Sequence, residues 1–420
     1  MIPVAVDPAL YGRNRRRFAR EMLADSVAVF LANDLASSNG AARARFRQNP
    51  DLHYLTGVTQ PETALLIAPA TGARGYAEVL FIRRPDHRAT RFSGPGLDLE
   101  RAAAVSGVRH VRYLDELDGV LHEFVALAAR IYVNTREDRH AYSEAPGPDL
   151  RYAERLRRAY PAHKYHRAQP ILRKIAVVKS AEEVALIREA AALAGRGLRA
   201  AAAAVAPGRP EHVAEAAALA EVIGAGAAGL AHPVRVASGA NALYPEYEAN
   251  AGVVGAHDAV QLHVGVTWAG YHASVARVRP APGGFGDRRR AVYARVEAAL
   301  EAAIASLLPG ATLEECEREL RERLVVAAAE LGVDAPAAGT HLPPRVFHHV
   351  GRYLRDPHAP DTPLQDGMTV TCEPALYLPG EGIGVQLRSI ALVTDQGPED
   401  LTADLPVALA SIEEGAGALA

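Results

Sequence analysis

Residues 365–394 read QDGMTVTCEPALYLPGEGIGVQLRSIALVT, and the rest of the chain is organised around this stretch. Apolar and β-branched residues dominate positions 368–372 and 390–394, which is typical of strands. The region between them is rich in Gly and Pro, which predicts turns. Glu373 follows the first predicted strand directly and precedes a proline. Because a strand end fixes the direction of a side chain, Glu373 is a candidate ligand or catalytic carboxylate.

The composition indicates a globular protein with more than one domain. At 420 residues the chain exceeds one ordinary hydrophobic core, so two domains are expected. Hydrophobic residues make up 49% of the sequence and charged residues 23%, which is typical of globular proteins. The formal net charge of -3 gives no electrostatic support for binding nucleic acid or an anionic membrane.

The two cysteines, Cys316 and Cys372, lie far apart and lack the spacing of paired metal ligands. Neither a disulfide framework nor a zinc ribbon is therefore predicted. The first residues lack the apolar segment of a secretory signal, and no run of eighteen apolar residues follows. We therefore expect a cytoplasmic protein without a membrane span.

Predicted strands and helices alternate in the first part of the chain, which indicates an α/β domain. Apolar runs predict strands at 27–31, 64–67, 78–82 and 131–134, and helical periodicity covers 11–24 and 114–129. A boundary is expected near 165–175. Beyond it, Ser180 and Glu183 have the spacing of a capping box, which predicts the start of a helix.

The second part of the chain contains two similar arrangements of helices. A predicted helix ends at Pro207-Gly208 and is followed by a helix at 211–223. About a hundred residues later, Pro309-Gly310 precedes helical runs at 312–324 and 325–331. Two helix pairs, each followed by strands, predict a pseudo-duplicated α+β domain.

Five motifs together resemble the aminopeptidase P and prolidase group of metallopeptidases. They are FRQNPDLHYLTG at 46–57, the segment 175–190, GVTWAGYHASVARV at 265–278, HHVG at 348–351, and the pair CEPALY and GIGVQL within 372–387. The resemblance implies an α/β creatinase-type domain over residues 1–170, followed by an α+β pita-bread domain over 171–420. In that family a dinuclear site, usually of manganese, removes the N-terminal residue of a Xaa-Pro peptide.

The resemblance also implies five metal-ligand positions, which the family fills with two Asp, one His and two Glu. In this chain the positions carry His263, Ser274, His348, Glu373 and Arg388. Only His348 and Glu373 match the family. The carboxylates missing at 274 and 388 are the ones that the family uses to bridge its two metals.

Chemistry argues against two metals at these positions. A serine is a weak neutral ligand, and a guanidinium has donors only and keeps its charge. At an effective dielectric near 20, a unit charge about 4 Å from another contributes roughly 4 kcal/mol, before the doubled charge of a metal is counted. We therefore expect no metal cofactor, and a family member that has lost its peptidase activity.

Three substrate-side positions implied by the resemblance also depart from the family. Arg355 stands where the family has a proton-shuttling histidine, seven residues after His348. Glu246 stands at the position of a substrate-side histidine, and Gln386 at that of an arginine two residues before the last ligand.

Three interpretations of the remaining cluster stay open. In the first, Arg388 fills the metal position and pairs with Glu373, beside His263 and His348. In the second, His263, His348 and Glu373 hold one zinc or manganese ion with an open coordination position. In the third, the chain is a metal-independent hydrolase like creatinase, although the creatinase histidine maps near Glu246.

The resemblance leaves the ligand and the assembly as expectations. A retained pocket would bind a peptide or another small molecule, and the family's N-terminal domains suggest a homodimer. Nucleic acid and membrane partners are not expected.

Overall fold

The computed structural model describes residues 6–39, 42–69, 78–86, 90–92, 94–135, 146–280, 284–333, 342–357 and 361–414. These residues form two compact units that divide at Val177. Helix α7 (Gln169–Val177) spans the position at which the sequence places the boundary. Among the helices of the described residues, none has the length and apolar character required to cross a bilayer.

The first unit is built on a six-stranded sheet in the order β6-β5-β4-β1-β7-β8. Strand β1 runs parallel to β7 and antiparallel to β4, so the sheet is mixed. The strands are β1 (Ser26–Leu31), β4 (Ala64–Ile67), β5 (Glu78–Ile82), β6 (Val111–Tyr113), β7 (Arg130–Val133) and β8 (Lys164–Arg167). A separate pair, β2 (Ser37–Asn39) and β3 (Ala42–Arg43), is antiparallel.

Helices cover both faces of this sheet because successive side chains of a strand point to opposite faces. Ala28 and Phe30 of β1 belong to one hydrophobic cluster, whereas Val27 and Val29 belong to another. Residues of α1 (Pro8–Glu21), α2 (Pro50–Thr56), α4 (Leu99–Ser106) and α7 pack into the first cluster. Residues of α5 (Leu117–Val125) and α6 (Pro148–Ala159) pack into the second. The expected α/β class is confirmed.

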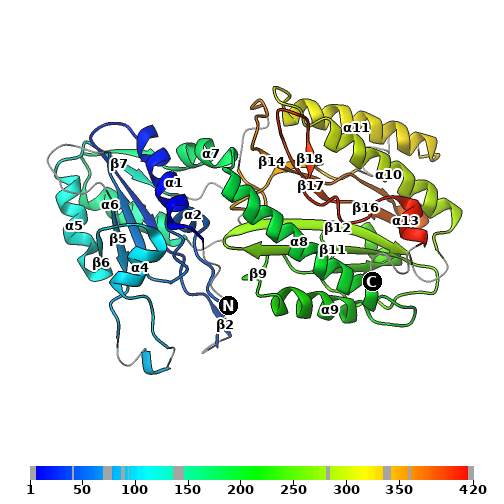
Figure 1. The fold of residues 1–420 in the computed structure, drawn as a ribbon, viewed down its shortest axis with the longest axis horizontal. Helices are drawn as coiled ribbons and strands as arrows, with labels where there is room; N and C mark the ends of the chain where they lie inside the picture. The colour runs from blue at the N-terminus through cyan, green and yellow to red at the C-terminus, as the bar shows by residue number, and fades with distance from the viewer. Residues whose placement is uncertain are drawn as a thin grey trace. The chain divides into compact units, whose positions relative to one another are not determined.

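The second unit contains an antiparallel sheet formed by β10 (Arg235–Ser238), β11 (Ala259–Trp268) and β12 (Tyr271–Pro280), with the short β9 (Gly229–Leu230) paired to β11. Helices α8 (Ala181–Ala204) and α9 (Glu211–Gly224) lie along one face of it (Figure 1). Val264 of β11 and Val275 of β12 pack there against Leu198 of α8 and Val222 of α9. Arg277 of β12 lies on the same face, opposite Leu262, and its buried guanidinium donates to the carbonyls of Ala276, Arg388 and Leu405.

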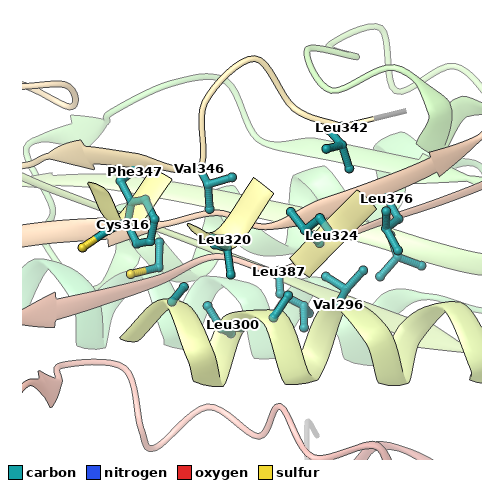
Figure 2. Close-up of a cluster of buried hydrophobic side chains, with 14 of the residues drawn as sticks. Val296, Leu300, Cys316, Leu320, Leu324, Leu342, Val346, Phe347, Leu376 and Leu387 are labelled. Carbon is teal, nitrogen blue, oxygen red and sulfur yellow. The ribbon is translucent and has the colours of Figure 1, made fainter. Parts of the chain in front are cut away.

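A second antiparallel sheet has the order β13-β14-β17-β18. Its strands are β13 (Phe347–His349), β14 (Thr369–Cys372), β17 (Ser389–Leu392) and β18 (Glu399–Asp400), and the hairpin β15 (Ala375–Leu378) and β16 (Ile383–Gln386) lies between β14 and β17 in the chain. Figure 2 shows the core formed with α10 (Asp287–Ala305) and α11 (Leu313–Glu330), where Leu300 and Leu320 belong to the same cluster as Leu387. The remaining short elements are η1 (Leu114–Glu116), η2 (Gly239–Leu243), η4 (Pro379–Glu381) and α13 (Leu409–Glu414).

Several local predictions are confirmed, and two are wrong. The Ser180 hydroxyl accepts from the Glu183 amide at 3.4 Å, and the Glu183 carboxylate accepts from the Ser180 amide at 2.9 Å, which is the predicted capping box. The predicted Gly/Pro turn region is instead the β15-β16 hairpin, with only η4 and Gly382 turning between its strands. The helical runs at 312–324 and 325–331 form one continuous helix, α11, because nothing breaks the helix between them. Cys316 and Cys372 are both free and buried.

Candidate functional site

Strand register places the site residues in one row across the second unit. Arg235 of β10 lies opposite His263 of β11, and His263 lies opposite Ala276 of β12. An isolated antiparallel bridge then joins Ala276 to Arg388, with the Arg388 amide donating to the Ala276 carbonyl at 3.1 Å. Residues directly opposite in antiparallel strands point to the same face. Arg235, His263 and Arg388 therefore share the sheet face that is turned away from α8 and α9.

Ser274 lies two residues before Ala276 on β12, so it points to the same face. The Arg388 guanidinium connects it to Glu373. One terminal nitrogen, Nη1, donates to the Ser274 hydroxyl at 2.8 Å, and the other, Nη2, donates to Oε2 of Glu373. The Arg388 and Glu373 side chains are only 6% and 3% exposed. The centre of the site is thus a buried arginine-carboxylate pair.

Two further groups contact the Glu373 carboxylate. Nη2 of the half-exposed Arg355 donates to Oε1 at 3.3 Å, and Nε2 of His348 lies 3.6 Å from the same oxygen. Burial would raise the pKa of Glu373, but the charge of Arg388, with those of His348 and Arg355, outweighs it and lowers the pKa below its usual range. Glu373 is therefore ionised at neutral pH and neutralised by arginine.

His263 and His348, at two of the positions where the resemblance implies metal ligands, are neutral in this environment. Burial is the main reason that the pKa of His348 falls to about 4. Burial, followed by the charges of Arg388 and Arg235, lowers the pKa of His263 well below its usual value. His263 lies between these two arginines in the row, and its Nδ1 has no hydrogen-bond partner among the described residues.

His232 is a site residue that the sequence did not reveal. Its Nδ1 lies 2.6 Å from the Pro233 carbonyl and its Nε2 lies 2.8 Å from the Ser274 hydroxyl. Since Nδ1 donates to the carbonyl, Nε2 accepts from Ser274, which in turn accepts from Arg388. Burial and the Arg388 charge lower the pKa of His232 to about 3, too low for an effective general base at neutral pH. His232 is a single histidine in an apolar run, so its spacing to other residues does not indicate a functional role.

The substrate-side positions separate into different environments. Arg355 reaches Glu373, as described above. Glu246 is instead bound by Arg235, which the sequence also did not single out. Neighbouring residues hold Gln386 in place. Its backbone amide donates to Oε1 of Gln261 at 2.8 Å, and its side-chain oxygen accepts from the Tyr377 hydroxyl at 3.3 Å.

The residues present do not fit a dinuclear metal centre. Across the described ranges, no three or more His, Cys, Asp or Glu side chains are grouped so that they would hold a metal ion. The guanidinium of Arg388 binds both Ser274 and Glu373 and places a permanent positive charge between them. Metal ligands must supply lone pairs, which this group lacks.

Comparisons with known proteins identify related sequences over nearly the whole chain. Residues 185–395 match the model of metallopeptidase family M24, and residues 11–132 match that of the aminopeptidase P N-terminal domain. The Xaa-Pro aminopeptidase of Escherichia coli is 25% identical over 423 residues, covering 94% of each chain. Xaa-Pro aminopeptidase 2 of Streptomyces coelicolor is 33% identical over 203 residues, covering 42% of this chain and 43% of its own.

A solved structure agrees with the sequence matches. Proline aminopeptidase P II from Yersinia pestis superposes with a TM-score of 0.87 at 26% identity, covering 97% of this chain and 99% of its own. The α/β and α+β units described above are thus a creatinase-type domain and a pita-bread domain. The chain therefore belongs to metallopeptidase family M24, within its aminopeptidase P group.

Proposed function

We propose that this chain is a metal-free member of the aminopeptidase P group that does not hydrolyse Xaa-Pro peptides and binds a peptide or another small molecule. The observation that carries the proposal is the position of Arg388. Its guanidinium hydrogen-bonds to both Ser274 and Glu373, which occupy two of the positions where the family resemblance places metal ligands.

The charges of the site support this proposal. A dinuclear centre needs several carboxylates to neutralise its ions, whereas Glu373 is the only carboxylate at the five ligand positions. It already pairs with Arg388 and Arg355. A divalent ion here would have to displace a buried guanidinium and then lie beside its charge, which is repulsive by several kcal/mol at roughly 4 Å even at an effective dielectric near 20.

The direct test is a hydrolysis assay with Xaa-Pro peptides after incubation with manganese, zinc or cobalt, and the Escherichia coli relative is the positive control. We expect no turnover with any of these metals. Turnover with manganese would overturn the proposal. Turnover that depends on a single zinc would favour a mononuclear site at His263, His348 and Glu373. Hydrolysis unaffected by chelators would favour a creatinase-like, metal-independent reaction.

A further inference from the structure

A small cavity adjoins the row of site residues on the side of Arg235. Arg235 and His263 line it from the first sheet, and Tyr377 and Gln386 line it from the β15-β16 hairpin. Its volume of ≈ 10 Å³ is about the minimum for one water molecule. In this conformation the cavity holds no more than one small polar group.

Two buried polar atoms of the lining residues have no hydrogen-bond partner among the described residues, namely Nε of Arg235 and Nδ1 of His263. The two residues lie directly opposite each other on β10 and β11, so their side chains lie on the same face of the sheet. Because buried polar groups in native proteins are almost always satisfied, such a pair indicates a place for a ligand atom.

The remaining hydrogen bonds of Arg235 show what kind of ligand would fit. Its Nη1 donates to the Pro245 carbonyl at 3.2 Å, and its Nη2 donates to the carboxylates of Glu246 and Glu248. The Arg235 side chain is 8% exposed, whereas those of Glu246 and Glu248 are 67% and 47% exposed. Exposed carboxylates hold an ion pair weakly, because holding them in place costs side-chain entropy and water screens the charge. A buried guanidinium is thus bound by two replaceable carboxylates.

The loop that carries these glutamates is fixed independently of their side chains. Tyr247, which lies between them, donates to Glu211 at 2.9 Å, and the same buried carboxylate accepts from the Ser238 amide at 2.6 Å and the Gly252 amide at 2.8 Å. The side chains of Glu246 and Glu248 can therefore leave Arg235 without unfolding the loop.

We infer that Arg235 anchors a binding site for a small ligand with a free carboxylate, and that Glu246 and Glu248 occupy the place of that carboxylate when no ligand is bound. A ligand carboxylate would accept from Nη2 and from the unpartnered Nε, the paired arrangement that favours arginine for carboxylates. The exposed ring of Tyr244, which also lines the cavity, would contact the apolar body of the ligand. This inference rests on the proposed function, because the ligand is bound without being hydrolysed.

The test is calorimetric titration of the full chain with the dipeptide Ala-Pro and with its C-terminal amide, with product analysis of each mixture. We expect the free acid to bind more tightly than the amide. Replacing Glu246→Gln together with Glu248→Gln removes the competing carboxylates and should tighten binding of the free acid by roughly five- to tenfold, the scale of two exposed ion pairs.

Arg235→Gln should abolish the preference for the acid. It removes a donor from two exposed carboxylates and from the Pro245 carbonyl but leaves no buried charge unpaired, so the variant is expected to fold, and its circular dichroism spectrum and melting temperature verify this. Glu221→Gln is the matched control, because Glu221 is a surface glutamate that pairs with Arg196 elsewhere. This control should bind both peptides as the unmodified chain does.

The possible outcomes distinguish the carboxylate site at Arg235 from the proposed function, binding without hydrolysis. Preferential binding of the acid, lost in Arg235→Gln and without product, supports both of them. The same preference with release of alanine and proline supports the site and overturns the proposed function. Equal binding of acid and amide, or a preference that survives Arg235→Gln, overturns the site and leaves the metal-free proposal intact.

Discussion

The two faces of the β11-β12 ribbon carry different kinds of residue. On the face covered by α8 and α9, Leu262, Val264 and Val275 are fully buried among apolar side chains. On the opposite face, His263 and Ser274 come from the same two strands and are also buried, but Ser274 accepts a hydrogen bond from Arg388, and the charges of Arg388 and Arg235 act on His263. Alternation within a strand thus lets one ribbon support both a hydrophobic core and a polar site.

The comparison shows how the fold tolerates changes at the site. The apolar face contributes its stability by burial, which does not depend on the identity of the residues that point the other way. On the polar face, the charges must instead balance one another, because an unpaired buried charge is costly. We therefore expect the effect of a substitution on the free energy of unfolding to depend on its charged partners when the residue is on the polar face. On the apolar face this effect should not depend on those partners.

The largest effect is expected from Glu373→Gln, which leaves the buried Arg388 without a carboxylate. Breaking a buried ion pair in this way typically costs about 3–5 kcal/mol in the free energy of unfolding. The double variant Glu373→Leu with Arg388→Met removes both charges and should recover most of that loss. Urea denaturation measures both. If the single and double variants are equally destabilised, the two residues do not act as a compensated pair.

On the apolar face, Leu262→Ala is expected to lower the free energy of unfolding by about 2–5 kcal/mol through lost burial and the cavity it leaves. Its effect should add to that of Glu373→Gln, since the two residues point to opposite faces. A double-mutant cycle by urea denaturation tests this independence. Strong coupling between the two changes would mean that the two faces are not separate.

The buried histidines of the polar face predict that the free energy of unfolding depends on pH. In the folded chain the pKa of His348 is about 4 and that of His232 about 3, whereas unfolded histidine titrates near 6.5. The unfolded chain therefore binds more protons below pH 6.5, and stability falls on acidification, by up to about 1.4 kcal/mol per pH unit for each histidine.

We expect this loss between pH 6.5 and 5, above the range in which Glu373 begins to protonate. His232→Gln should make the dependence shallower, and Leu262→Ala should leave its slope unchanged. Urea denaturation at pH 7, 6 and 5 measures the three slopes. A slope in His232→Gln as steep as that of the unmodified chain would contradict the description of His232 as buried and neutral.

The smallest effect on the free energy of unfolding is expected for a change on the surface of α9. Arg196 and Glu221 form an exposed ion pair between α8 and α9, and such pairs contribute roughly 0–1 kcal/mol. Glu221→Gln should therefore change the midpoint of urea denaturation very little. A loss as large as that of Glu373→Gln would remove the distinction between buried and exposed pairs on which the comparison depends.

The sequence predicted the fold class and most of the strands, because apolar runs and motif order along the chain carry that information. It also named Ser274, Glu373 and Arg388, which the structure brings into one network. His232 and Arg235 were not found, because they reach the site only through strand pairing between distant segments. Periodicity shows which face a side chain takes within a strand but not which strand lies beside it.

The most direct test of the central claim is the metal content of the chain, measured by mass spectrometry after purification without chelators and incubation with manganese. The unmodified chain is compared with the triple variant His263→Asp, Ser274→Asp, Arg388→Glu, which restores the family's carboxylates. We predict substoichiometric metal in the unmodified chain and a clear gain in the variant. Two manganese ions per unmodified chain, or no gain in the variant, would contradict the assignment of Arg388 to the metal position.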